Sequence, residues 1–400
     1  MRQIDRCIGL SKAVAGVITD PRDTDRITHP LRDLIAQRLY GLCCGYEDLN
    51  DHQQFRHDPL MQTALGRIDE LASSPTLCRL ESRASRADIM ALNAVLVDQF
   101  IASHPVAPSE LILDIDASDI PLHGVQEQRE FHAYYDHHCY LPLNVLCGKA
   151  TLACVLRRSR IDGAKHAAAV IKLRITRLRQ VWPQTRFIVR GDSGFCRQRL
   201  IRWCEWQSVG YLIGLARNAR LHGIVAGWEP LREEEFKQAQ TKQRRIREFT
   251  YAAQSWDREW RGITRLEFRH QGSNPQFIVT NLNGVKENLY DELYRQRGEA
   301  ENQIKEAQLD FFGPRASCHR FLANWLHLMF SALDYTRMSR LREIALTNTE
   351  LAKACAATIR VKLLKFAAAV VRNTRRVRIL LASHHLRPLV FKSAAQALAL

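Results

Sequence analysis

The sequence predicts a mixed α/β fold flanked by helical regions at both ends. Between residues 110 and 216, segments rich in β-branched and aromatic residues alternate with segments of helical periodicity. Their order is strand, strand, strand, helix, strand, helix, strand, which indicates a mixed sheet covered by helices. Residues 1–105 and 315–400 show mainly helical spacing, and a chain of 400 residues with 46% apolar side chains can bury a large core.

The first half of the chain supplies helices and then strands. Within residues 1–105, polar breaks separate short helical stretches, and a longer helix is predicted over about 86–101. Strands rich in branched and aromatic residues are then predicted over 110–118, 131–148 and 150–159.

A helix follows these strands. Ile171, Ile175 and Leu178 recur at helical spacing, and Pro183 ends the run. The later elements are a strand over 186–192, a helix around Leu200, a strand over 211–216, hairpin-like strands within 218–276, a strand over 276–282 and a helix over 289–311.

The charge of the chain favours a polyanionic partner such as nucleic acid. The net charge is +16, and residues from Arg315 onward hold fifteen Lys or Arg against three acidic residues, or +12 of that total. An anionic membrane surface and an ordinary solvated helix face are the alternatives. No apolar run approaches the roughly 18 residues of a spanning helix, so we expect a soluble cytoplasmic protein with no membrane partner. Eleven cysteines without a C-x-x-C pair suggest small buried residues in a reducing compartment.

Carboxylates stand where two predicted strands end. Asp114 and Asp116 share one side of the strand "LILDIDASD", roughly 7 Å apart, and need backbone N–H groups, a basic side chain or a metal ion as partners. Asp192 follows the strand in "FIVRGDSGF", where capping of a helix is the alternative role.

A third carboxylate lies on the predicted helix over 289–311. Leu289, Ala300 and Ile304 belong to its buried stripe, while Glu301 lies on a neighbouring stripe with a basic residue one turn away on each side, Arg297 and Lys305. A salt-bridged helix surface is the simpler explanation. Together, the strand-end Asp residues and the helical Glu are the oxygen ligands that two Mg²⁺ or Mn²⁺ ions require, about 3.5–4 Å apart, for in-line attack at phosphorus.

These residues carry a resemblance to a known family. The chain resembles the DDE transposases of bacterial insertion sequences, in the branch with a Y-x-x-R-x-x-x-E helix, here Tyr294, Arg297 and Glu301. Stretches similar to that subgroup are "GYEDLND" (45–51), "SSPTLCRLE" (73–81), "DIDASDIPLHGVQE" (114–127), "RGDSGF" (190–195), "FIVTNL" (277–282) and "TIRVKLLK" (358–365).

The resemblance implies an RNase H-like catalytic core with Asp116, Asp192 and Glu301 as the catalytic, metal-binding triad. Asp116 is preferred to Asp114 because its D-x-S setting is similar to the family's. Two Mg²⁺ or Mn²⁺ ions are the implied cofactors, and double-stranded DNA, as terminal inverted repeats and target, is the implied partner of a homodimer. The implied DNA contacts are Tyr294, Arg297, Lys305, Trp256 and Trp260, with a core position as the alternative for both Trp residues. The family usually has Lys where this chain has Gln308.

The implied division of the chain has five parts. They are a helical DNA-binding or dimer region (1–105), the first part of the core (106–217), a β-rich insertion (218–276), the second part of the core (277–314) and a basic, mostly helical region (315–400). The implied place of action is the bacterial cytoplasm, at the nucleoid.

Other functions fit the sequence less well. His123, His132, His137, His138 and Cys139 cluster, but their spacing matches no common zinc pattern. No phosphate-binding loop or dinucleotide fingerprint is present, and no recognisable Ser or Cys nucleophile has a spaced His and acid. Two further alternatives stay open: a catalytically idle DNA-binding relative that acts as a regulator, and a metal-dependent nuclease without end specificity.

Overall fold

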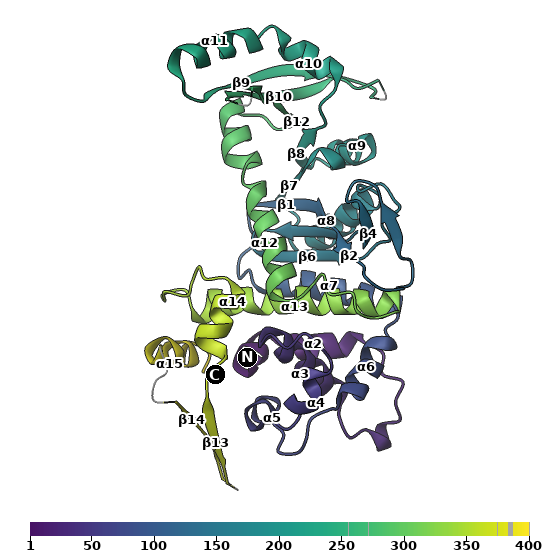
Figure 1. The fold of residues 1–400 in the computed structure, drawn as a ribbon, viewed down its shortest axis with the longest axis vertical. Helices are drawn as coiled ribbons and strands as arrows, with labels where there is room; N and C mark the ends of the chain where they lie inside the picture. The colour runs from purple at the N-terminus through teal and green to yellow at the C-terminus, as the bar shows by residue number, and fades with distance from the viewer. Residues whose placement is uncertain (255, 271, 374, 383–386, 400) are drawn as a thin grey trace.

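A nine-stranded mixed sheet runs through the computed structural model, which describes residues 1–254, 256–270, 272–373, 375–382 and 387–399 (Figure 1). Strand β1 pairs in parallel with β7 and antiparallel with β5, β7 pairs in parallel with β8, and β5 pairs antiparallel with β6. The predicted mixed α/β fold is therefore confirmed. The bounds of these strands are β1 (Glu110–Ala117), β5 (Leu143–Cys147), β6 (Ala150–Val155), β7 (Arg186–Gly191) and β8 (Gly210–Leu215).

The sheet continues beyond β8 into the segment predicted to be β-rich. β12 (Gln276–Thr280) pairs antiparallel with β8, and the hairpin of β9 (Gln243–Tyr251) and β10 (Trp260–Arg269) adds to β12, with the short β11 (Gly272–Ser273) at β10. The hairpin confirms the predicted alternation. Two helices that the prediction lacked, α10 (Ala219–Ala226) and α11 (Glu229–Ala239), precede it. In α11, proline stands in the first turn and good helix formers follow, which explains the helix.

Different helices pack against the two faces of the sheet. Leu113 and Ile115 of β1 point into a large apolar core with α8 (Ala167–Val181) and α9 (Gln198–Trp206). The opposite face of β1 carries Asp114 and Asp116, because side chains alternate along a strand. Helix α12 (Arg297–Asp310) lies against β1 and crosses the sheet in front of it (Figure 1).

The helix predicted over 289–311 is split in two. A π-helical segment, Asn288–Tyr294, comes first, in which the N–H of Arg295 donates to the carbonyl of Tyr290, and α12 begins at Arg297. The wider turn shifts the phase of the helix, so Gln296, at helical spacing between Leu289 and Ala300, is exposed. The predicted buried positions Leu289, Ala300 and Ile304 are confirmed.

The predicted strand over 131–148 is also interrupted. Its first part forms β3 (Glu130–His132) and β4 (His137–Tyr140), which pair with each other and, through β4, with β2 (Ile120–Pro121) in a separate three-stranded sheet. Its last part is β5. Pro142 lies between β4 and β5 and has no N–H to donate, which ends the ladder.

The N-terminal helices pack on a long helix near the other end of the chain. Helix α13 (Phe321–Ala345) is buried along nearly its whole length between β6 and α7 on one side and α3 on the other (Figure 1). The predicted helix over 86–101 is confirmed as α7, which begins with a capping box of Ser85 and Asp88. The N-terminal helices are α1 (Arg2–Ile8), α2 (Leu10–Val17), α3 (Leu31–Cys43), α4 (Asp51–Phe55), α5 (Pro59–Leu65), α6 (Ser74–Ser82) and α7 (Arg86–Ala102).

The chain after α13 is less helical than predicted. Helix α14 (Ala356–Ile359) and a π-helical segment, Arg360–Leu364, are followed by a hairpin of β13 (Ala368–Arg372) and β14 (Val377–Leu381), and then by α15 (Pro388–Ala397). Val370, Val371 and Ile379 favour the strands because β-branched side chains suit a pleated surface. None of the helices in the described residues is long and apolar enough to cross a bilayer. All eleven cysteines are free, and eight of them are buried or half-buried.

Candidate active site

The register of β1 and β7 brings two predicted acids together. The strands are parallel, and Ile115 is the register partner of Gly191, so Asp116 and Asp192 occupy equivalent positions one residue further along. Parallel neighbours lie about 4.8 Å apart, and register partners project to the same face of the sheet. Asp116 and Asp192 therefore project beside each other, on the face that α12 covers.

Asp192 also makes the capping contact that its sequence context suggested. Its Oδ1 accepts a hydrogen bond from the N–H of Gly194 at 2.8 Å, which fixes the turn after β7. Gly214 on β8 makes room for this turn, since a Cβ there would lie 2.7 Å from the backbone N of Ser193 and 2.8 Å from the hydroxyl of Tyr294. Capping occupies one carboxylate oxygen, and Oδ2 is left for another ligand.

Asp114 has a partner of its own. Its two oxygens accept from Nε and Nη2 of Arg190 at 2.5 and 2.7 Å, and both side chains are buried. Arg190 also donates to the carbonyl of Leu293 in the π-helical segment. This ion pair anchors the segment before α12 on the sheet, so Asp114 has a structural partner that Asp116 lacks.

Arg297 links the two acids that come from different elements. Its guanidinium lies 3.6 Å from Oδ1 of Asp116 and forms an ion pair with Glu301 one turn further along α12. The side chain of Asp116 is 18% exposed and that of Glu301 42% exposed. The structure therefore brings the third predicted acid to the strand-end pair through a shared cation.

The surroundings of the site disfavour the ionised form of Asp116. Burial raises the pKa of Asp116 to about 7; the neighbouring Asp192 and Glu301 raise it as well, while Arg297 opposes them. Burial also raises the pKa of the Tyr294 phenol, which lies close to Arg297 and Asp192. Three carboxylates share one guanidinium here, an excess of negative charge that a further cation would offset.

The donor set fits hard divalent ions. Carboxylate oxygens are what Mg²⁺ and Mn²⁺ prefer, and Asp116, Asp192 and Glu301 provide them from three elements. Within the described residues, no group of three acids, histidines or cysteines already stands in ligating arrangement. The guanidinium of Arg297 lies between Asp116 and Glu301, so ion binding requires it to move aside.

The other predicted DNA contacts fall in different settings. Lys305, exposed on α12, has no acidic partner in the part of the chain described here. Gln308, where the family usually has Lys, donates to the hydroxyl of Ser118 at 3.0 Å and ties α12 to the turn after β1. Trp260 is only 5% exposed, and Trp256 packs against it with ring centroids 4.3 Å apart. Trp260 belongs to the apolar core and the half-buried Trp256 packs against that core, which is the alternative that the sequence left open.

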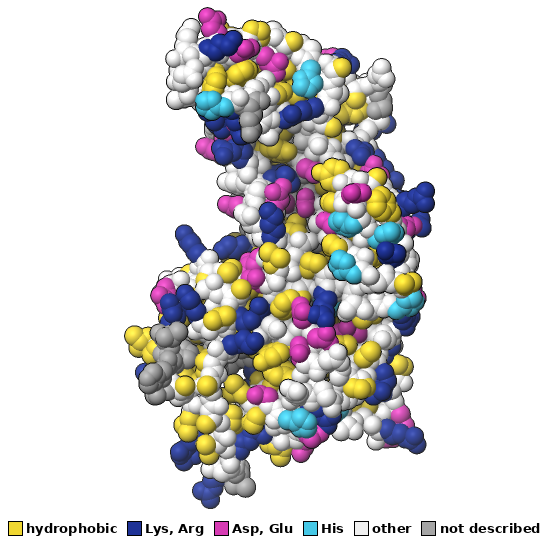
Figure 2. Space-filling model, in the orientation of Figure 1, with side chains coloured by type: hydrophobic (Ala, Val, Ile, Leu, Met, Phe, Trp, Pro, Cys, Tyr) yellow, Lys and Arg dark blue, Asp and Glu magenta, His cyan; other side chains and the backbone are white. Residues whose placement is uncertain are grey.

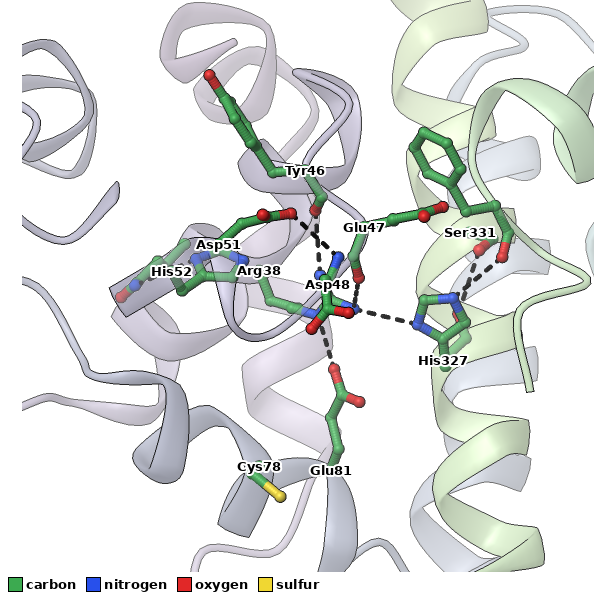
Figure 3. A network of polar contacts seen from close by, with 12 residues as sticks. Arg38, Tyr46, Glu47, Asp48, Asp51, His52, Cys78, Glu81, His327 and Ser331 are labelled. Carbon is green, nitrogen blue, oxygen red and sulfur yellow. Dashed lines mark hydrogen bonds and ion pairs between the residues drawn. The ribbon is translucent and has the colours of Figure 1, made fainter. Parts of the chain in front are cut away.

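A second polar cluster, which the sequence did not predict, lies between the N-terminal helices and α13 (Figure 3). Arg38 of α3 forms a buried ion pair with Glu81 of α6 at 2.6 Å and donates to the carbonyl of Glu47 at 2.8 Å. Its Nη2 lies 3.2 Å from Nδ1 of His327, whose Nε2 lies 3.1 Å from the carbonyl of Phe312.

The tautomer of His327 follows from these contacts. Arg38 can only donate, so Nδ1 of His327 accepts, and Nε2 carries the proton that goes to the Phe312 carbonyl. Burial, assisted by Arg38, lowers the pKa of His327 to about 4, in keeping with a neutral ring. The cluster draws on 45–51 and 73–81, two stretches that carry the family resemblance, so their role here is structural.

Comparison with known proteins gives one family for the whole chain. The model of the family described as transposase DDE domain group 1 matches residues 1–400. Among curated proteins, no sequence matches the chain significantly. Seven chains of solved structures do match. One is the piggyBac transposase synaptic complex with hairpin DNA, solved by cryo-EM, with 10% identity and a TM-score of 0.45 over 89% of this chain and 76% of that chain.

Proposed function

The chain belongs to the DDE transposases, and from that premise we propose that it is a cut-and-paste transposase of the bacterial insertion-sequence branch. It binds the terminal inverted repeats of its element, brings two ends together as a homodimer, hydrolyses the end phosphodiesters and joins the free 3′ hydroxyls to target DNA. Strand transfer requires no nucleotide cofactor, because one phosphodiester replaces another.

The observation that carries this proposal is the register of β1 and β7. It sets Asp116 beside Asp192, and Arg297 connects Asp116 to Glu301 of α12. Each acid comes from a different element, so the cluster depends on the fold as a whole. The strand order is β6-β5-β1-β7-β8, and the two Asp residues stand at the carboxyl ends of β1 and β7. This arrangement supports an RNase H-like core over 106–217 and 277–314, interrupted by 218–276.

In this mechanism Asp116, Asp192 and Glu301 would hold two Mg²⁺ or Mn²⁺ ions, which when bound would supply activation of the attacking oxygen and stabilisation of the leaving oxygen. Asp116 must first give up the proton that its raised pKa favours. We assign the guanidinium of Arg297, once displaced from the carboxylates, to a DNA phosphate. Lys305, one turn beyond Glu301, binds the backbone.

The two ends of the chain complete the complex. We assign DNA binding and dimer contacts to 1–105 and backbone binding to the basic region 315–400, whose net charge of +12 suits a polyanion. We place its action on DNA in the bacterial cytoplasm, at the nucleoid.

Cleavage assays on a DNA end from the element test the proposal. Wild-type protein should cleave the cognate end with Mg²⁺ or Mn²⁺, and Asp192→Asn and Glu301→Gln should each lose cleavage while keeping the affinity of the protein for that end in gel shifts. Because Asp192 caps a turn, thermal unfolding of both variants serves as the folding control. Cleavage that survives either substitution contradicts the proposal.

The same assay separates the two alternatives. A gel shift without cleavage under either ion would identify a catalytically idle regulator. Equal cleavage of cognate and scrambled duplexes would identify a nuclease without end specificity.

A further inference from the structure

The small sheet that follows β1 presents aromatic rings to solvent. Tyr134, in the turn between β3 and β4, is 84% exposed, and Phe131 on β3 is 50% exposed. The ring of Tyr134 meets that of Tyr135 at 5.0 Å and nearly at right angles, and His132 lies 4.9 Å from Tyr135. In Figure 2, histidine and hydrophobic side chains gather on the right of the molecule, over the region labelled β4 in Figure 1. An exposed cluster of rings in a polar surface indicates a binding site.

This hairpin lies next to the candidate active site. Nε2 of His137 on β4 contacts Oδ2 of Asp119 at 2.8 Å, in the turn between β1 and β2. Burial, together with the carboxylates of Asp119 and Asp116, raises the pKa of Tyr135 to about 12. The contact with Asp119, three residues after Asp116, places the aromatic cluster beside the end of β1.

A hollow beside the rings is bordered by unpaired positive charge. It has a volume of about 810 Å³ and is lined by residues 129–134, 138 and 159–162. That volume is within the range of ligand pockets. Arg129 and Arg160 line it, are exposed and have no acidic side-chain partner within the described ranges.

The acidic residues of the hollow are already engaged. Glu130 accepts from the backbone N–H of Arg160 at 2.8 Å and lies 3.6 Å from Arg158. Asp162 forms an ion pair with Arg197 at 2.7 Å and accepts from the N–H of Ala164. The charge left for a ligand in this hollow is that of Arg129 and Arg160, which suits an anionic partner.

We propose that the β3–β4 hairpin and this hollow form a platform for unpaired DNA bases, with Tyr134 as the stacking ring and Arg129 and Arg160 on the backbone phosphates. Aromatic stacking combined with cationic contacts is how proteins hold single strands without reading their sequence. The choice of DNA over another anion rests on the proposed function. Trp260 is buried, and one side of the half-buried Trp256 packs against it, so Tyr134 is the more accessible ring.

A fluorescent single strand tests the platform without cleavage. The probe is oligothymidine with one central 2-aminopurine, titrated with full-length protein in EDTA. Wild-type protein should bind the probe and change its emission through stacking. Tyr134→Ala should weaken binding between about fivefold and 150-fold, the range that loss of one base–aromatic stack gives. Tyr134→Phe should bind like wild type.

Matched variants separate stacking from general effects. Trp206→Ala removes another exposed ring, 76% exposed at the end of α9. It should leave both the affinity for the probe and the emission of the bound probe unchanged. Arg160→Gln should lower the slope of log affinity against log salt by about 0.7, the value for one single-strand phosphate contact.

Three outcomes would overturn the platform: no binding by wild-type protein, equal binding by Tyr134→Ala, or an equal loss in Trp206→Ala. None of them bears on end cleavage, which the metal-dependent assay above measures with duplex DNA. Failure of the platform and failure of the proposed function are thus distinguishable.

Discussion

The clusters around Arg38 and Arg297 both combine arginine with carboxylates, and they differ in how completely their polar groups are paired. Around Arg38, each guanidinium nitrogen has a partner, and the ion pair with Glu81 is almost fully buried. Around Arg297, three carboxylates share one guanidinium, and Glu301 remains 42% exposed. The chemistry of the side chains is similar, and the difference lies in pairing and access to solvent.

The difference separates a structural role from a functional one. A buried cluster with all its hydrogen bonds made holds α3, α6 and α13 in a single arrangement, and breaking it leaves an uncompensated charge. A cluster with excess like charge at an open edge gains from a cation or a phosphate, so it suits binding. Substitutions in the first cluster should change stability, and substitutions in the second should change activity.

The largest expected effect is on catalysis, in Asp116→Asn. Losing a ligand to ions that contribute several kcal/mol to the transition state should reduce end cleavage by at least about 1000-fold. Because burial raises the pKa of Asp116, its ionised form is unfavourable in the folded protein, so the substitution should not lower the unfolding temperature at pH 8.

Asp114→Asn is the matched variant two residues away. It removes the carboxylate of the buried pair with Arg190, which should lower the free energy of unfolding by about 3–5 kcal/mol, measured by urea denaturation. A stable Asp114→Asn protein without cleavage, beside an active Asp116→Asn protein, would reverse the assignment of the first ligand.

Glu81→Gln should show the next largest effect, on stability alone. It leaves Arg38 buried without its carboxylate, at a cost of about 3 kcal/mol in unfolding free energy. The matched Glu301→Gln removes a half-exposed pair and should cost less than about 1 kcal/mol. Urea denaturation measures both, and equal losses of stability would contradict the contrast between the clusters.

The pH dependence of stability should report on the cluster around Arg38, which contains His327. The pKa of His327 is about 4 in the folded protein and about 6.5 when unfolded, so the unfolded chain takes up the proton first as pH falls. Its contribution is complete above about pH 6.5 and is lost progressively toward pH 4; the loss amounts to about 2 kcal/mol at pH 5. His327→Gln should lack this part of the pH dependence in urea denaturation, and an unchanged dependence would mean that the imidazole titrates normally.

A smaller effect is expected on ion affinity in Arg297→Gln. Removing the guanidinium that lies between Asp116 and Glu301 should tighten Mn²⁺ binding to the DNA-free protein by about tenfold, or about 1.4 kcal/mol. Isothermal titration at pH 8, where Asp116 is ionised, measures this. Asp192→Asn is the control that should weaken binding, and weaker binding in Arg297→Gln would show that Arg297 supports the ions instead of competing with them.

The smallest expected effect concerns the salt dependence of DNA binding. Lys305→Ala should lower the slope of log affinity against log salt by about 0.9, the value for one phosphate contact on duplex DNA. Lys172→Ala on α8, which covers the opposite face of the sheet, should not change it. Equal slopes for wild type and Lys305→Ala would remove Lys305 from the interface.

The sequence by itself determined the features that depend on local periodicity. Alternation placed Asp114 and Asp116 on one side of a strand, helical spacing placed Arg297 one turn before Glu301, and the resemblance along the chain identified the family. Each of these depends on residues a few positions apart or on motifs that recur in a family, so no knowledge of long-range contacts was needed.

Only the tertiary structure decided which partner each polar group has. Asp114 pairs with Arg190, 76 positions away, and Arg38 meets His327, 289 positions away. Burial of Trp260 depends in the same way on which strands join the sheet. Hydrogen bonds and burial act over a few ångströms in space whatever the separation along the chain, so local patterns could propose these residues but could not assign their contacts.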